Sequence, residues 1–116
     1  MNIPVLLYHS ISDDKSNVSL SKNNFESQLI YLKKNGYKSI DLNDENTNLK
    51  KNIVITFDDG YKDILINALP LLKKYNFKAI CYVVSDLVGK ENIWDLNKKK
   101  FLKKELMSKN DIIEWI

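Results

Sequence analysis

The sequence predicts an α/β fold, in which parallel strands form a sheet and helices flank it. Short apolar segments alternate along the chain with segments whose apolar residues recur at helical spacing. Residues 53–57 (IVITF) are the clearest strand, because a run rich in β-branched residues suits a strand that is buried on both faces. Such strands in alternation with helices are typical of a parallel sheet.

The first third of the chain supplies one strand and one helix. Residues 3–8 are apolar enough for a strand, and residues 9–19 are expected to form a polar loop after it. Ser21 can cap a helix that runs to about Asn35, and Gly36 is a suitable C-terminal stop. Three apolar side chains share one face of that helix, namely Phe25, Leu29 and Leu32.

The middle of the chain continues the alternation. Residues 37–42 predict a short strand, and residues 43–52, which are polar without periodicity, predict a surface loop. After the central strand, Asn67 is expected to cap a helix that tolerates Pro70 in its first turn. Residues 79–84 then form the next strand.

The C-terminal residues predict one more helix. Ser108 followed by Asp111 resembles a capping box, which announces a helix from about Lys109. An apolar stripe begins at Ile112, but the sequence ends after roughly two turns. We favour an interrupted βα repeat, and the alternative is a short helix that docks on the sheet.

Two adjacent carboxylates follow the central strand. Asp58 and Asp59 fall at or just past its C-terminal end, where α/β folds place their chemistry, and Gly60 then marks the exit. Adjacent carboxylates repel each other, and the pair is explained if one binds a cation while the other transfers a proton. The alternative is a loop whose aspartates cap the next turn.

Four blocks of the sequence, in order along the chain, resemble the polysaccharide deacetylases, which are the family 4 carbohydrate esterases with a NodB homology domain. The block TFDDGY at residues 56–61 is similar to the first signature motif of that family. The resemblance spans at least residues 3–89, and its other blocks are residues 4–11 (PVLLYHSI), residues 25–37, and residues 67–75 with 77–84.

The resemblance implies a fold and an activity. The fold would be a distorted (β/α) barrel of which this chain holds about half. The activity would be a metal-dependent hydrolase that removes N-acetyl groups from a polysaccharide or an amino sugar. Asp59 would be a ligand of a divalent metal, usually zinc, and Asp58 would be the general base that takes a proton from the attacking water.

Three further residues are candidates for the same pocket. His9 follows a strand that is expected to lie beside the strand of Asp58, so it either lines the pocket or is a structural histidine. Tyr61 and Trp94 either stack on sugar rings or serve in packing.

The resemblance also predicts that the metal site is incomplete. The family adds two histidines from a later His-x-x-x-His segment, whereas this chain has a single histidine. Catalytic zinc sites normally keep three protein ligands. Residues 1–116 are therefore interpreted as the N-terminal portion of a deacetylase domain, truncated before that segment. Its expected partners are an N-acetylated glycan and a complementary C-terminal chain.

Two other classes of function fit parts of the sequence. The chain could be a catalytically inactive, degenerate relative that binds a glycan or a partner chain. It could also be a receiver-like signalling domain, but receivers need their acidic pair after the first strand, where this chain has Tyr8, His9 and Ser10.

Composition excludes several functions. The net charge of +3 comes with 18 lysines and no arginine, which argues against a nucleic-acid reader. The lysines at positions 98–100, 103 and 104 either hold an anion or form a solvated helix face, and we favour the latter. Cys81, the single cysteine, is expected to be a buried small hydrophobe.

Targeting signals are not evident. The longest apolar runs are far too short to span a bilayer. Met1 and Asn2 lead directly into a strand-like segment rather than a signal peptide, so the expected location is the cytoplasm.

Overall fold

A parallel sheet forms the centre of the structure, a computed structural model that describes residues 3–43, 51–97 and 102–116. Its middle strand is β5 (Asn52–Asp59). One edge of β5 pairs with β1 (Val5–Tyr8). The other edge pairs first with β4 (Lys38–Ser39) and then, nearer its C-terminal end, with β6 (Ile80–Val83). All three pairings are parallel, so the predicted α/β class is confirmed.

The strand lengths differ from the sequence-based expectation in a consistent way. The central strand is longer than residues 53–57 and includes Asp58 and Asp59, because β5 has neighbours on both edges. The neighbouring strands are shorter than residues 3–8, 37–42 and 79–84. They extend only as far as β5 offers them ladder partners.

The segment after β1 is not a plain loop. It contains a second, short parallel pair, β2 (Ser10–Ile11) and β3 (Ser19–Leu20). Ser10 and Ile11 are fully buried, so the expected polar loop at residues 9–19 is anchored in the core at its start.

The first helix agrees with its prediction. Helix α1 (Lys22–Lys34) begins after Ser21, whose hydroxyl accepts a hydrogen bond from the Asn24 N–H at 3.1 Å. It ends at Asn35, and Gly36 follows with a φ of +79°, a left-handed conformation that glycine adopts without strain.

The second helical segment corrects the predicted cap. A π-helix, η1 (Ile64–Ala68), leads directly into α2 (Leu69–Lys74). Pro70 lies in the first turn of α2 and has no N–H to donate. The preceding turn is a wide one, in which the Leu69 N–H donates to the Ile64 carbonyl, and it accommodates the proline. Asn67 is not the cap, because its side-chain amide donates to the Ile11 carbonyl at 2.8 Å.

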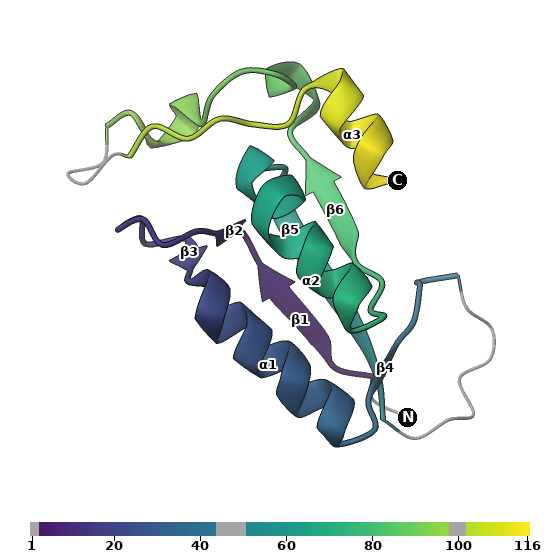
Figure 1. Cartoon of the computed structure of the whole chain (residues 1–116). Helices are drawn as coiled ribbons and strands as arrows, with labels where there is room; N and C mark the ends of the chain where they lie inside the picture. The colour runs from purple at the N-terminus through teal and green to yellow at the C-terminus, as the bar shows by residue number, and fades with distance from the viewer. Residues whose placement is uncertain (1–2, 44–50, 98–101) are drawn as a thin grey trace.

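The helices α1 and α2 cover one face of the sheet (Figure 1). Between them and the sheet lies an aromatic cluster, in which the Phe25 ring meets Tyr8 and Phe57 at centroid distances of 5.1 and 5.9 Å. On the opposite face, Val5 and Leu7 are exposed.

The last third of the chain crosses the carboxyl ends of the strands. It contains two short 3-10 helices, η2 (Ser85–Leu87) and η3 (Ile93–Asp95), and the final helix α3 (Lys109–Trp115) (Figure 1). The capping box of Ser108 and Asp111 is confirmed. The Trp115 ring packs at 5.7 Å from that of Phe57, so α3 docks on the core. None of the helices in residues 3–43, 51–97 and 102–116 has the length and apolar character needed to cross a membrane.

Candidate active site

The acidic pair lies where the sequence predicts it. Asp58 and Asp59 are the last two residues of β5 and pair with Tyr82 and Val83 of β6. The carboxyl ends of β1, β5 and β6 meet at this edge, because the strands are parallel. Loops that follow parallel strands converge here, which is the usual place for an active site in an α/β fold.

The backbone turns sharply at Asp59 and Gly60. Both residues have left-handed conformations, with φ of +76° and +73°. A Cβ atom at Gly60 would lie 3.0 Å from Cγ1 of Val83, so only glycine fits between the turn and β6. The Met107 N–H donates to the Gly60 carbonyl at 2.8 Å and holds the turn from the other side. A strained conformation of an aspartate, held by its surroundings, is typical of functional sites.

The charges around Asp59 disfavour its ionised form. Burial raises the pKa of the Asp59 carboxyl, and the nearby carboxylates of Asp58 and Asp95 raise it further, while His9 opposes them. Tyr8, the last residue of β1, pairs with Phe57, so His9 and Asp58 are the residues that follow on neighbouring segments at this edge of the sheet. A carboxylate whose charge is disfavoured gains by taking up a proton or by binding a cation.

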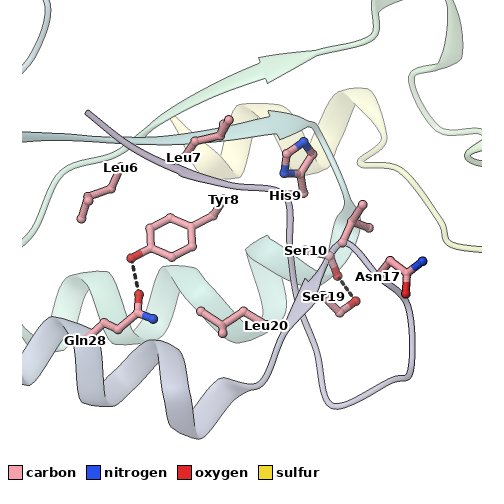
Figure 2. A pocket seen from close by; sticks show the side chains of 10 residues that line it. Leu6, Leu7, Tyr8, His9, Ser10, Asn17, Ser19, Leu20 and Gln28 are labelled. Atoms are coloured by element: carbon pink, nitrogen blue, oxygen red, sulfur yellow. Dashed lines mark hydrogen bonds between the residues drawn. The ribbon is translucent and has the colours of Figure 1, made fainter. Parts of the chain in front are cut away.

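His9 also lines a pocket of about 530 Å³ (Figure 2). In this view Tyr8 and His9 point to opposite sides of the backbone, and the Tyr8 hydroxyl donates to Oε1 of Gln28 at 2.6 Å. The side chains of this pocket come from β1, the segment after it and α1, namely Leu6, Leu7, Tyr8, His9, Ser10, Asn17, Val18, Ser19, Leu20 and Gln28. His9 thus connects a pocket on the β1 side to the acidic pair on β5.

Tyr61 has no face open to a ligand. It is fully buried, with the Trp94 ring 6.2 Å from its own ring centroid and the Lys104 Nζ atom at 5.6 Å. Burial, together with the carboxylates of Asp59, Asp95 and Asp63, raises its pKa. This placement favours the packing role that the sequence also allowed. Trp94 is 40% exposed and keeps a face at the surface.

The described residues do not by themselves fit a catalytic metal ion. Within residues 3–43, 51–97 and 102–116, no group of three His, Cys, Asp or Glu side chains could hold one. A hydrolytic zinc site normally has three protein ligands. Asp59 could therefore provide only part of such a site.

Lys104 corrects the interpretation of the lysine cluster. Instead of a solvated helix face, residues 102–107 form an extended segment, and the Lys104 ammonium is buried in ionic contact with Asp14 and Asp63. The partners of this lysine are distant in sequence, which is why its pattern gave no signal. Lys98, Lys99 and Lys100 lie outside the described residues.

Cys81 agrees with its predicted role. It is half-buried in β6 and packs against the core. Burial raises the pKa of its thiol to about 11, so the thiolate, which is the reactive form, is scarce at neutral pH.

Comparison with known proteins finds matches over most of the chain. A model of the polysaccharide deacetylase family matches residues 45–112, which include the acidic pair. The poly-beta-1,6-N-acetyl-D-glucosamine N-deacetylase of Staphylococcus aureus is 34% identical over 106 residues, covering 84% of this chain and 37% of the relative. The chain spans about a third of the length of the curated relatives it matches.

Solved structures give the same result. A polysaccharide deacetylase from Bacillus cereus superposes with a TM-score of 0.75 at 31% identity, covering 97% of this chain and 35% of that one. IcaB from Ammonifex degensii superposes with a TM-score of 0.80 at 26% identity, covering 97% of this chain and 47% of that one. These neighbours confirm the predicted fold class, an α/β fold of the polysaccharide deacetylase type.

Proposed function

This chain belongs to the polysaccharide deacetylase family, and on that premise we propose that it takes part in the hydrolysis of N-acetyl groups on a polysaccharide or an amino sugar. The observation that carries the proposal is the position of Asp58 and Asp59. They occupy the carboxyl end of the central strand, inside the family match and at the edge of the sheet where His9 follows β1.

The proposed reaction assigns a proton transfer to Asp58. Its carboxylate takes a proton from a water molecule as the water oxygen attacks the acetamide carbonyl carbon. The C–N bond then breaks, the amine of the sugar takes up the proton that Asp58 received, and acetate leaves. A general base of this kind contributes roughly 10²- to 10⁴-fold to the rate. The tight turn at Asp59 and Gly60 keeps the base in place.

The substrate proposal rests on the relatives. The Staphylococcus aureus relative is named for poly-beta-1,6-N-acetyl-D-glucosamine, so an N-acetylated glycan is the proposed substrate class. The pocket beside His9 offers side-chain amide groups from Asn17 and Gln28 that could bind sugar hydroxyls.

Metal dependence is a further part of the proposal. Asp59 would provide one ligand, because a carboxylate at this position matches the metal-binding aspartate of the family. The other ligands would come from a complementary polypeptide, since the chain has one histidine and the described residues hold no group of three potential ligands.

Acetate release tests the proposal. The chain alone is expected to release little acetate from N-acetylglucosamine oligomers, with or without added zinc. Adding or fusing the C-terminal segment of the Bacillus cereus relative, which superposes on this chain, should restore turnover. Robust zinc-dependent turnover by the chain alone would contradict the incomplete metal site, and the lack of turnover in every complemented form would contradict the deacetylase proposal.

Two variants of the complemented enzyme separate the roles of the carboxylates. Asp58→Asn should keep zinc affinity but lower kcat by roughly 10²-fold or more, as expected for the loss of a general base. Asp59→Asn should weaken zinc binding, because an amide oxygen is a poorer ligand than a carboxylate. If both variants lose zinc equally, Asp58 is a ligand and its assignment as the base is wrong.

An inactive, glycan-binding relative is the second candidate function. The observation that favours it is the incomplete ligand set of the described residues. It predicts binding of the oligomers to the chain without turnover in any complemented form.

A further inference from the structure

Another carboxylate, that of Asp63, lies four residues after Asp59 and binds several groups at once. The Asp63 Oδ2 atom accepts a hydrogen bond from the Ser10 hydroxyl at 2.5 Å and contacts the Lys104 Nζ atom at 2.9 Å. Its other oxygen, Oδ1, accepts from the Ile11 N–H at 3.1 Å. One side chain from the segment after the acidic pair therefore contacts two consecutive residues directly after His9.

The same helical segment holds Ile11 a second time. One turn after Asp63, the Asn67 side-chain amide donates to the Ile11 carbonyl at 2.8 Å. Both backbone polar groups of Ile11, which is fully buried, are thus bound by side chains of one helical segment. These two hydrogen bonds fix the position of Ile11, two residues after His9, relative to the helical segment that follows the turn at Asp59.

Lys104 stabilises the ionised Asp63 side chain in these contacts electrostatically. Its side chain is only 7% exposed, and its ammonium group lies between the carboxylates of Asp63 and Asp14. Burial alone would lower the pKa of Lys104, but the two carboxylates outweigh burial and raise it. In the Lys104 cluster, which consists of Ser10, Asp14, Asp63 and Lys104, the ammonium group therefore remains charged at physiological pH and is shared by two carboxylates.

The cluster connects three segments that surround the acidic pair. Asp63 comes from the segment after β5, Ser10 and Asp14 from the segment after β1, and Lys104 from the strand-like segment beside Tyr61 and Gly60. Neither Asp63 nor Lys104 is assigned a role by the proposed reaction.

From these contacts we propose that Asp63 is a positioning residue, which through its bonds to Ser10 and Ile11 holds the segment that carries His9 in place beside the carboxyl end of β5. The effect of Asp63 on turnover rests on the proposed function, whereas its effect on the position of His9 does not. Asp63 also lies on the segment that follows the acidic pair, so its loss would shift Asp58 relative to the segment that carries His9. Misplacement of a reacting group by about 1 Å costs on the order of 10²-fold in rate, so the proposal predicts a loss of kcat rather than a change in KM.

His9 is the single histidine of the chain, and its imidazole signals in a proton–carbon NMR spectrum therefore report its surroundings without overlap. Asp63→Asn should keep the fold, as judged by the backbone amide spectrum, and should shift the His9 signals. Glu26→Gln is the matched control, because Glu26 is also a carboxylate bound by a lysine and a hydroxyl, those of Lys74 and Tyr75. It should leave the His9 signals in place.

A second pair of variants decides the question if Asp63→Asn unfolds the protein. Ser10→Ala removes the bonds of the Ser10 hydroxyl to both Asp63 and Ser19. Ser19→Ala removes only the bond between the two serines. A larger shift of the His9 signals in Ser10→Ala than in Ser19→Ala supports the proposal, and equal shifts overturn it.

Turnover completes the test in the complemented enzyme. The Asp63→Asn variant is expected to lose about 10- to 100-fold in kcat with KM nearly unchanged. A folded variant whose His9 signals do not move overturns the positioning role, and so does one whose signals move while kcat stays at the wild-type value. If no form of the protein turns over, the proposed function fails, and the NMR comparison still decides whether Asp63 positions His9.

Discussion

Two pairs of aspartates lie near the carboxyl end of β5, and their surroundings are opposite. Asp58 and Asp59 are adjacent in sequence, and Asp59 is in a left-handed conformation with a raised pKa. Asp14 and Asp63 are far apart in sequence but share the ammonium group of Lys104. For Asp14, burial raises the pKa, but hydrogen bonds from Lys104 and neighbouring groups outweigh burial and bring it to about 2.

The difference separates a functional arrangement from a stabilising one. A carboxylate whose charge is unfavourable is reactive, since it gains by taking up a proton or by binding a cation. A carboxylate whose charge is neutralised by a buried lysine is inert and holds segments together. The chain thus places Asp59 on a strained turn, and near that turn it pairs two other aspartates with a buried lysine.

The largest effect is expected on removal of the shared cation. Lys104→Met keeps most of the side-chain volume but leaves Asp14 and Asp63 without their positive partner, which should lower the free energy of unfolding by about 3 kcal/mol or more. Chemical denaturation measures this loss. The matched control is Lys74→Met, which breaks an exposed ion pair with Glu26. If the two variants lose the same stability, the Lys104 cluster is no more than a surface ion pair.

A second prediction concerns the turn itself. Gly60→Ala adds a Cβ atom at 3.0 Å from Val83 and at a positive φ, whereas Gly36→Ala, at a similar φ, adds one in open space. The Gly36 variant should lose about 1 kcal/mol from backbone strain alone, and the Gly60 variant about 2–4 kcal/mol from strain and overpacking together. Thermal and chemical unfolding of the two variants give the comparison. Equal losses of stability in the two variants would mean that β6 shifts to make room for the new Cβ atom without a cost in free energy.

The third prediction is the acid sensitivity of the Lys104 cluster. Because the folded pKa of Asp14 is lowered from 3.8 to about 2, its contribution to stability is complete above the unfolded pKa and is lost as the pH falls through the folded pKa. That contribution is about 1–2 kcal/mol, since part of the side chain is exposed to screening by water. The free energy of unfolding, measured from pH 6 to pH 2, should fall less steeply in Asp14→Asn than in the wild type. Parallel curves would exclude Asp14 as a source of acid sensitivity.

Local signals in the sequence predict much of the fold and of the acidic pair. The caps at Ser21 and Ser108, the apolar run that forms β5 and the position of Asp58 and Asp59 at its end were all predictable. Each depends on neighbouring residues and on the period of the pattern. The family resemblance came from the same local blocks.

Long-range contacts explain what could not be predicted. Asn67 looks like a helix cap but binds the Ile11 carbonyl, 56 residues away. Lys104 looks like part of a solvated basic run but is buried against Asp14, 90 residues away. A polar residue in a polar segment gives no sign of such a partner, because charge and hydropathy patterns describe only the local face.

The smallest predicted effect is a gain in stability rather than a loss, and it tests the difference between the two pairs of aspartates most directly. Asp59→Asn removes a charge that burial, Asp58 and Asp95 disfavour, and asparagine tolerates the left-handed φ of +76° well. At neutral pH it should stabilise the protein by about 0.5 kcal/mol, as is common when a strained functional residue is replaced. Asp63→Asn, the same change in the neutralised pair, should destabilise it, because Lys104 loses a partner. Because the pKa of Asp59 is raised, its ionisation opposes folding above the unfolded pKa, so the gain from Asp59→Asn should disappear as the pH falls below that value. Denaturation of both variants at pH 7 and at pH 3 measures the sign of each change in the free energy of unfolding. A destabilised Asp59→Asn variant at pH 7 would show that the Asp59 carboxylate contributes to folding and that the two pairs of aspartates do not differ in kind.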